Sequence, residues 1–338
     1  MVIRSRVPLR LSFGGGGTDV SPYCEEYGGA VINSTIDRYA TVSLFPQRGE
    51  LVTVESIDYD KTINFSIDQY LAYDGHLDLI KGVINSIRNN YNLPSGFNLR
   101  IHNDAPPGSG LGSSSAVCVA MIGAFKQWLN LPLTPYDIAR SAYNIERNEL
   151  GIRGGRQDQY ASAFGGFNFI EFTSDSIVNP LRLREETIYE LNHSLVLAYI
   201  GGSHDSSEIL KNQIDDMASK SKVTLEALHE IKKLAFEMKN CLVKGMLGKF
   251  GMLLDEAWKN KRQITRGITN STIDELYAKT KRAGALGGKL SGAGGGGFMF
   301  FFVDIDKKYS VIKELQSQGA QILNYSFTTQ GLHTWEVK

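Results

Sequence analysis

The first half of the chain alternates between apolar and other residues over short runs. Val7, Leu9, Leu11 and Phe13 occupy every second position, a period of two that predicts a strand over residues 2–13. Further strands are predicted at 30–36, 39–45, 51–57, 97–102, 165–173 and 194–200.

Helical periodicity appears between these strands. Residues 76–91 carry leucine and isoleucine at helical spacing, whereas 114–129 are apolar on nearly all sides, which predicts a buried helix. Pro135, after a Thr134 cap, is typical of a helix first turn, and we expect that helix to run to about Leu150.

Beyond about residue 180 the pattern changes to longer helical stretches rich in Lys, Glu, Leu and Met. Helices are predicted over most of 205–260 and at 271–283 and 306–317, and strands at 298–303 and 321–327. Strands first and helices later favour an α+β protein of two packed domains, residues 1–180 and 181–338.

Composition narrows the class of protein. The chain has 338 residues, 42% hydrophobic and 21% charged, with a formal net charge of zero, so no basic field favours nucleic acid or an anionic membrane. Cys24, Cys118 and Cys241 lie too far apart for a disulfide framework or a metal motif. The N-terminus lacks the apolar block of a signal peptide, and the longest apolar run, 298–303, is too short to span a bilayer. We therefore expect a cytoplasmic protein.

Glycine is the outlier, with 35 residues, and its densest use with serine is PPGSGLGSSSA at 106–116. Backbone N–H groups bared by glycine, followed by a helix N-terminus, form an anion site, and the serines can cap the helix or reach a metal ion on phosphates. The alternative is a glycine-rich turn with a serine cap. A dinucleotide fingerprint would need glycine at Ser113, and the nearest P-loop candidate, ending at Gly288-Lys289, fails at Ala283 and Leu290.

Two other stretches carry candidate chemistry. In PLRLSFGGGGTD, residues 8–19, four glycines allow close approach of another molecule and Asp19 can accept hydrogen bonds from hydroxyls, unless the stretch is a hairpin with Asp19 as a helix cap. In residues 144–166, Glu146 and Glu149 share a helix face and Asp158 follows in a glycine-broken loop. A helix carboxylate with a nearby aspartate suits metal binding and handling of a hydroxyl proton. The alternative is that Glu146 is an ordinary surface glutamate and Asp158 an ordinary turn residue.

The last glycine-rich stretch, SGAGGGGF at 291–298, lies between a helix and a strand. That order is the reverse of a phosphate loop, so close packing against a neighbouring loop is the simpler interpretation. No histidine triad, zinc spacing or nucleophile elbow is evident.

The order of these motifs resembles the GHMP kinases over essentially the whole chain. That family has an N-terminal substrate motif, a central Pro-x-x-x-Gly-Leu-x-Ser-Ser-[Ser/Ala]-Ala phosphate loop and a C-terminal glycine-rich motif, which here fall at 8–19, 107–116 and 289–298. The resemblance implies a two-domain fold, with an N-terminal ribosomal protein S5 domain 2-like domain and a C-terminal ferredoxin-like α/β sandwich. It also implies ATP and Mg²⁺ as cofactors and leaves open a homodimer.

The resemblance carries site roles residue by residue. Ser114 and Glu146 fall where the family binds Mg²⁺, Asp158 falls at the catalytic aspartate, and Arg10 falls beside the reacting hydroxyl. The implied ATP-binding residues are Pro107, Gly108, Ser109, Gly110, Leu111, Gly112, Ser113, Ser114 and Ser115, and the implied sugar-binding residues are Gly15, Gly16, Gly17, Thr18 and Asp19. Glu149 has no counterpart in the family and is expected on the surface.

Within the family, three stretches of sequence are most similar to a bacterial branch that acts on D-glycero-D-manno-heptose 7-phosphate. They are PLRLSFGGGGTD, EYGGAVINSTIDRYATV and GGRQDQYASAFGGFNFIEF. The implied reaction is phosphorylation of the anomeric (C1) hydroxyl to the 1,7-bisphosphate, on a route to nucleotide-activated heptose for surface polysaccharide. Arg38, Arg153 and Arg156 are candidates for holding the substrate phosphate. The alternatives are a fucose-type or other hexose 1-kinase, a diphosphomevalonate decarboxylase of the same fold, and a non-catalytic sugar sensor.

Overall fold

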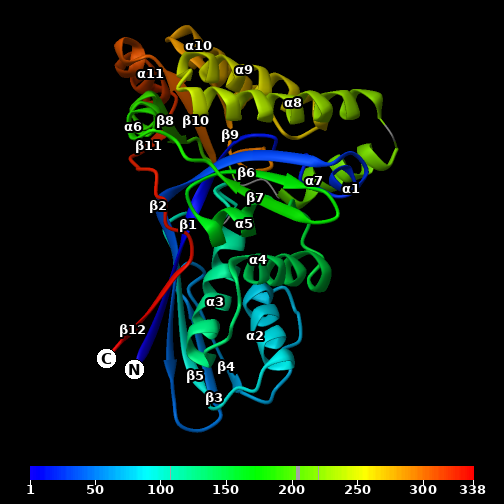
Figure 1. The fold of residues 1–338 in the computed structure, drawn as a ribbon, viewed down its shortest axis with the longest axis vertical. Helices are drawn as coiled ribbons and strands as arrows, with labels where there is room; N and C mark the ends of the chain where they lie inside the picture. Colours follow the sequence, from blue (N-terminus) through cyan, green and yellow to red (C-terminus); the bar gives the residue numbers. More distant parts are fainter. Residues whose placement is uncertain (107, 203–205, 220) are drawn as a thin grey trace.

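A computed structural model describes residues 1–106, 108–202, 206–219 and 221–338. Figure 1 shows two β-sheets, one above the other, each covered by helices, with both chain termini side by side at the lower end. In the part of the chain that the structure describes, no helix combines the length and apolarity needed to cross a membrane.

The lower sheet has eight strands, in the order β12-β1-β2-β5-β3-β4, with β6 on β2 and β7 on β6. All pairs are antiparallel except β3 with β5. The strands are β1 Val2–Gly14, β2 Gly29–Pro46, β3 Leu51–Ser56, β4 Lys61–Ser66, β5 Phe97–Asn103, β6 Phe167–Phe172, β7 Ser176–Pro180 and β12 His333–Val337.

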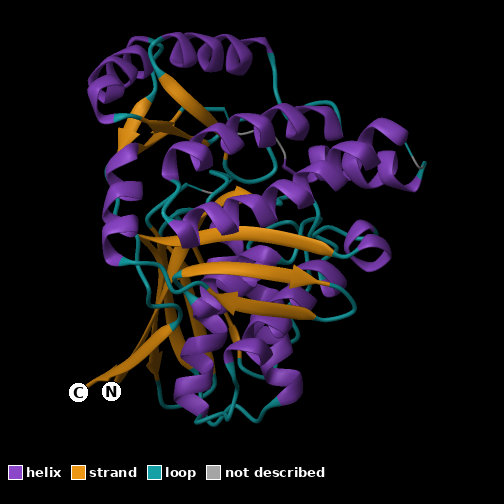
Figure 2. Cartoon of the chain, turned by 45° about the horizontal axis from the view of Figure 1, so that its top comes forward, coloured by secondary structure: helices purple, strands orange, loops and turns teal. Residues whose placement is uncertain are grey.

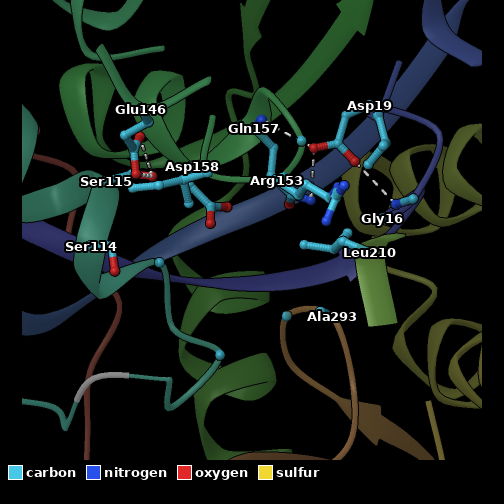
Figure 3. A pocket seen from close by; sticks show the side chains of 18 of the residues that line it. Gly16, Asp19, Ser114, Ser115, Glu146, Arg153, Gln157, Asp158, Leu210 and Ala293 are labelled. Atoms are coloured by element: carbon cyan, nitrogen blue, oxygen red, sulfur yellow. Dashed lines mark hydrogen bonds between the residues drawn. The ribbon is translucent and has the colours of Figure 1, made fainter. Parts of the chain in front are cut away.

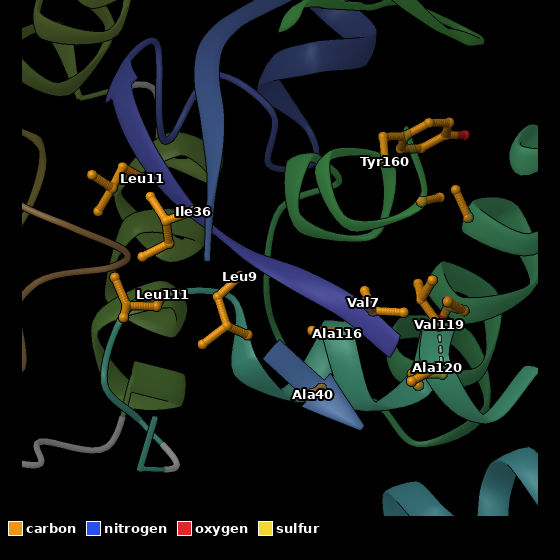
Figure 4. Packing of buried hydrophobic residues seen from close by; sticks show 14 of the residues in the cluster. Val7, Leu9, Leu11, Ile36, Ala40, Leu111, Ala116, Val119, Ala120 and Tyr160 are labelled. Carbon is orange, nitrogen blue, oxygen red and sulfur yellow. Dashed lines mark hydrogen bonds between the residues drawn. The ribbon is translucent and has the colours of Figure 1, made fainter. Parts of the chain in front are cut away.

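The first helices of the chain lie beside this sheet. They are α1 Tyr23–Tyr27, α2 Asp78–Asn90, α3 Ser113–Leu129, α4 Pro135–Tyr143, the π-helical turn η1 Asn144–Glu149 and α5 Gln157–Phe164. Figure 4 shows Leu9 of β1 beside Leu111 and Ala116, where the chain enters α3. The Arg10 backbone N–H donates to the Leu111 carbonyl at 3.0 Å. This packing fixes the start of α3 against the middle of β1.

The upper sheet is antiparallel, with strand order β11-β8-β10-β9. Its strands are β8 Leu195–Tyr199, β9 Ala285–Leu290, β10 Phe298–Val303 and β11 Gln321–Leu323. The helices that follow β7 are α6 Glu185–Ser194, α7 Ser206–Ala218, α8 Lys222–Lys244, α9 Leu247–Ile264, α10 Ser271–Arg282 and α11 Ile305–Ser317. Helices α6, α9, α10 and α11 contact the upper sheet, whereas α8 contacts β1 and β2 of the lower sheet. Figure 2 shows helices in purple beside the orange strands. An order in which the first and third strands are central is the ferredoxin-like arrangement, so the predicted two-domain α+β fold is confirmed.

The two sheets share a core. Phe13 of β1 packs edge-on against Phe250 of α9 at a ring-centroid separation of 5.5 Å and against Phe300 of β10 at 5.9 Å. Aromatic side chains bury large areas, so this contact holds the two units together without a flexible linker.

The structure differs from the sequence expectations at several boundaries. The predicted strands at 30–36 and 39–45 form one strand, β2, and the predicted helix from Pro135 ends as the turn η1. The strand β12 pairs with β1, so residues 333–337 lie in the lower sheet although the predicted second domain spans 181–338. Asp158 was expected in a loop, but it lies in the first turn of α5, because 157–164 carries apolar residues at helical spacing.

Candidate functional site

The predicted motifs meet at one cavity of about 340 Å³. Figure 3 shows Asp158 and the Ser115–Glu146 pair on one side of it, Asp19 and Gln157 on another, and Ala293 of the C-terminal glycine loop below. Helices α7 and α9 contribute Leu210, Gln213 and Lys261 to its wall. Segments distant in sequence therefore build a single site.

The phosphate loop depends on glycine for its path. Gly108, Gly110 and Gly112 have φ values of +73°, +82° and +77°, a region that other residues rarely adopt. Gly112 precedes α3 and supplies no side-chain cap, so the N–H groups of the first helical turn are not capped by a side chain.

Most of the predicted ATP-binding residues line the cavity. Those that do are Gly108, Gly110, Gly112, Ser113, Ser114 and Ser115. Ser109 and Leu111 are buried behind the loop, and Pro107 lies outside the described residues.

The C-terminal glycine loop, residues 291–297, packs directly against the phosphate loop. A Cβ atom on Gly110 would lie 2.3 Å from the Ser291 carbonyl oxygen, and one on Gly297 would lie 2.4 Å from the Ser109 carbonyl oxygen. The Ser291 hydroxyl donates to the Gly110 carbonyl at 2.8 Å. The two backbones approach so closely that side chains are excluded, which agrees with the packing role expected for this stretch.

Arg10 and Asp158 form an ion pair beside the phosphate loop. Arg10 Nε and Nη2 each lie 2.7 Å from Asp158 Oδ1, and Arg10 Nη1 also donates to the Gly110 carbonyl. The Arg10 side chain is 3% exposed and that of Asp158 is 22% exposed. Asp158 therefore reaches the cavity with a fixed orientation and an adjacent positive charge.

Asp19 is held by amides of the surrounding backbone. Its Oδ1 accepts from the Gly17 N–H at 3.0 Å, and its Oδ2 accepts from the Gln157 N–H at 3.1 Å. Gly155 leaves room for this carboxylate, because a Cβ there would lie 1.9 Å from Asp19 Oδ2. This carboxylate is pre-positioned with capacity left for hydroxyl donors.

The other residues of the N-terminal loop divide into two groups. Gly16, Gly17 and Asp19 line the cavity. The Thr18 hydroxyl instead bonds to the Gly15 carbonyl at 2.8 Å, and Gly15 packs against Ala30, where a Cβ would lie 1.8 Å from the carbonyl oxygen. Thr18 and Gly15 thus brace the loop from behind.

Glu146 is buried at the cavity edge. The Ser115 hydroxyl lies 3.0 Å and 2.8 Å from its two carboxylate oxygens, and the Gln159 amide also donates to it. Burial raises the pKa of Glu146, although Arg147 nearby opposes that shift. Besides these neutral donors, Arg147 Nη1 lies 3.8 Å from Glu146 Oε1, and a buried carboxylate favours such a nearby cation.

The metal prediction paired Glu146 with Ser114, but the serine that bonds Glu146 is Ser115. The Ser114 side chain is exposed to the cavity below that pair (Figure 3). Hydroxyl and carboxylate oxygens are donors that Mg²⁺ accepts, and both residues line the same cavity. Among the described residues, no three His, Cys, Asp or Glu side chains cluster as metal ligands. Glu149 lies on the surface, as expected.

Two buried lysines were missed in the sequence. Lys261 lines the cavity, and burial lowers its pKa to about 8. Lys289 of β9 donates to the Ser12 carbonyl at 2.7 Å, and burial lowers its pKa as well. The available signal was periodicity, since Lys261 falls on the apolar stripe of its helix with Leu254 and Trp258.

The three arginines proposed for the substrate phosphate differ in whether they line the cavity. Arg153 lines the cavity, whereas Arg38 donates to the carbonyl of Asn324 and Arg156 pairs with Glu25.

A second hollow shares Ser113 and Ser114 with the main cavity and was not predicted from the sequence. Its other lining residues include Tyr59, Leu77, Ile80, Ile101 and Val117.

Comparison with known proteins places these features in a family. Residues 78–166 match the model for the GHMP kinases N terminal domain, and residues 238–321 match that for the GHMP kinases C terminal. The chain is 40% identical to D-glycero-alpha-D-manno-heptose 7-phosphate kinase of Campylobacter jejuni, over 99% of both proteins. It is 25% identical to L-fucokinase/L-fucose-1-P guanylyltransferase of Bacteroides fragilis, over 94% of this chain and 36% of that protein.

A solved structure supports the same comparison. The crystal structure of a D-glycero-D-manno-heptose 1-phosphate kinase from Bacteroides thetaiotaomicron superimposes with a TM-score of 0.85 and 36% identity, over 99% of both chains.

Proposed function

This chain belongs to the GHMP kinase family, and on that premise we propose that it phosphorylates the anomeric (C1) hydroxyl of D-glycero-D-manno-heptose 7-phosphate. Family membership makes it a phosphotransferase with an alcohol group as acceptor and ATP as donor. The product would be the 1,7-bisphosphate, an intermediate toward nucleotide-activated heptose for surface polysaccharide. The observation that carries the proposal is that Asp158 and Asp19 face the same cavity as the phosphate loop.

ATP would lie with its phosphates on the loop from Gly108 to Ser115. The uncapped N-terminus of α3 and the glycine N–H groups supply donors and a positive dipole end. The second hollow, which shares Ser113 and Ser114 with the cavity, offers Leu77, Ile80 and Val117 as apolar contacts for the base.

The same cavity suits Mg²⁺, which Ser114 and Glu146 would hold. Phosphoryl-transfer sites bind this ion through one or two carboxylates plus phosphate oxygens, so a single buried carboxylate is enough. The ion would neutralise charge on the β- and γ-phosphoryl oxygens. Ser115 and Gln159 would fix the Glu146 carboxylate through the hydrogen bonds that they donate to it.

The acceptor end would be organised by Asp158. The sugar hydroxyl oxygen would form a bond to the γ-phosphorus while the bond from that phosphorus to the bridging oxygen of ADP breaks. Asp158 would orient that hydroxyl and receive its proton. Arg10, bonded to Asp158 and to the Gly110 carbonyl, would offset negative charge between acceptor and donor.

Recognition of the heptose phosphate would use the opposite part of the cavity. The Asp19 carboxylate would accept hydrogen bonds from sugar hydroxyls, and the Gly16–Gly17 backbone would offer these hydroxyls further donors and acceptors. Of the three candidate arginines, Arg153 is the one that lines the cavity, so it would contact the substrate phosphate. The sugar itself is inferred from the relative that is 40% identical over the full length.

The proposal is tested by ADP release with a panel of acceptors, with Asp158→Asn as the blank. The panel contains heptose 7-phosphate, heptose 1-phosphate, unphosphorylated heptose, fucose, galactose and mevalonate. Selective turnover of the 7-phosphate is expected. Selective turnover of fucose or another unphosphorylated sugar would replace the proposal with a hexose 1-kinase, for which the fucokinase relative is the precedent.

A further inference from the structure

Lys261 is a charged residue at a position of α9 where the helix pattern predicts an apolar side chain. On α9 it follows Leu254, Ala257 and Trp258 along the buried stripe of the helix, and only 5% of its surface is exposed. Burying an ammonium group is costly unless an anion compensates it. A buried lysine at such a position therefore indicates that an anionic group binds next to it.

The protein provides Lys261 with one polar contact among the described residues. Its Nζ donates to the Gly292 carbonyl, and no carboxylate oxygen of the described residues lies within 4.0 Å. An ammonium group has three donors, so two remain for a ligand in the cavity that Lys261 lines.

Charged groups from four elements face Lys261: Arg10 of β1, Asp19 after β1, Asp158 of α5 and Lys289 of β9. Asp158 pairs with Arg10 and Asp19 accepts from backbone amides, and among the described residues neither carboxylate lies within 4.0 Å of the Lys261 ammonium. Because Lys261 has no close opposite charge there, this wall of the cavity favours binding of an anion.

The contact with Gly292 indicates which anion that is. Gly292 belongs to the loop packed on the phosphate loop, and a Cβ there would lie 2.7 Å from the Gly110 Cα. Lys261 therefore lies beside the phosphate loop, in contact with the loop that packs against it. We propose that Lys261 contacts the terminal phosphoryl group of bound ATP and stays on it during transfer, an inference that rests on the proposed kinase function.

Lys261 would act as a fixed cation without giving up a proton. As the acceptor oxygen bonds to the γ-phosphorus and the bond to the ADP oxygen breaks, the three outer oxygens of the phosphoryl group remain anionic. The Lys261 ammonium would donate hydrogen bonds to these oxygens from the upper domain, while Arg10 offsets charge from the lower one.

Burial gives this contact a pH dependence that can be measured. Because burial lowers the pKa of Lys261 to about 8, with Arg10 adding to that effect and the two acids opposing it, the free protein loses this positive charge as pH rises through that value. Affinity for a γ-phosphate should decline over the same range.

The test compares nucleotides that differ only in the terminal group, with no sugar present. The dissociation constants of AMPPNP and ADP are measured by calorimetry with Mg²⁺ at pH 7. Lys261→Met is expected to weaken AMPPNP at least tenfold while ADP changes less than twofold, and Lys261→Arg to retain most of the AMPPNP affinity. Lys289→Met is the matched buried-lysine control and should leave the ratio of the two constants unchanged.

Equal loss of both nucleotides in Lys261→Met, or no loss of either, would overturn the assignment. The pH arm decides independently if that variant folds poorly: wild-type preference for AMPPNP over ADP should fade between pH 7 and ~9.5, whereas Lys261→Arg, whose guanidinium stays charged, should show no such decline. A wild-type preference that is flat across this range would contradict the proposal. Since no sugar enters these assays, failure of the heptose assignment leaves their outcome unaffected.

Discussion

Replacing Gly110 with alanine tests whether the two glycine loops form one rigid wall of the active cavity. The added Cβ would lie 2.3 Å from the Ser291 carbonyl oxygen, about 1 Å closer than ordinary contact, so the loops would have to part. Parting them would also strain the two hydrogen bonds that the Gly110 carbonyl accepts, from Ser291 Oγ and Arg10 Nη1.

The expected loss follows from these contacts. A φ of +82° costs alanine about 1–2 kcal/mol, and each hydrogen bond lost adds about 1 kcal/mol, for roughly 3–4 kcal/mol in total. Gly108→Ala is the matched control, because its φ is +73° but, chain neighbours aside, no atom of the described residues lies within 4 Å of an added Cβ. That control should lose only the ~1–2 kcal/mol of backbone strain.

Thermal unfolding without nucleotide measures the difference. An unfolding entropy of about 2.1 cal/mol/K per residue over 338 residues gives about 1.4 °C per kcal/mol, so Gly110→Ala should unfold about 3 °C below Gly108→Ala. AMPPNP should also bind Gly110→Ala more weakly than it binds Gly108→Ala. Equal unfolding temperatures for the two variants would refute the rigid packing of the loops.

Three further substitutions test separate parts of the site. Asp158→Asn should lower turnover by about 10²–10⁴-fold with ATP affinity changed little, and a folded variant of near-normal turnover would exclude a proton-handling role. Ser115→Ala removes the hydroxyl bonded to Glu146 and should raise the Mg²⁺ concentration for half-maximal activity about 10-fold or more; an unchanged Mg²⁺ titration would separate Glu146 from the metal. Arg153→Met should raise KM for the sugar phosphate but not for ATP, whereas Arg38→Met, outside the cavity, should change neither, and equal effects would place the substrate phosphate elsewhere.

Much of the fold was readable because its signals are local. The alternation from Val7 to Phe13 marks β1, and glycines at 108, 110 and 112 mark a backbone path that the structure confirms with positive φ at each. The order of motifs indicated the family, because each motif keeps its own neighbours in sequence.

What the sequence left undecided depends on rotation and long-range packing. Ser114 and Ser115 are adjacent at the start of α3, and about 100° of helical rotation decides which of them bonds Glu146. Lys261 carries no motif, and its importance follows from Gly292, which lies 31 residues away in the chain. Strand β12 is short and mostly exposed, so its pairing with β1 was not visible in a hydrophobic pattern.

The most direct test of the central claim is the position of the new phosphate. Product formed from heptose 7-phosphate, ATP and Mg²⁺ is examined by ³¹P and ¹H NMR. The account predicts a second phosphorus resonance coupled to the anomeric proton, with the phosphate at C7 retained. A new phosphate coupled to any other sugar proton would contradict the assignment of this cavity to the anomeric hydroxyl.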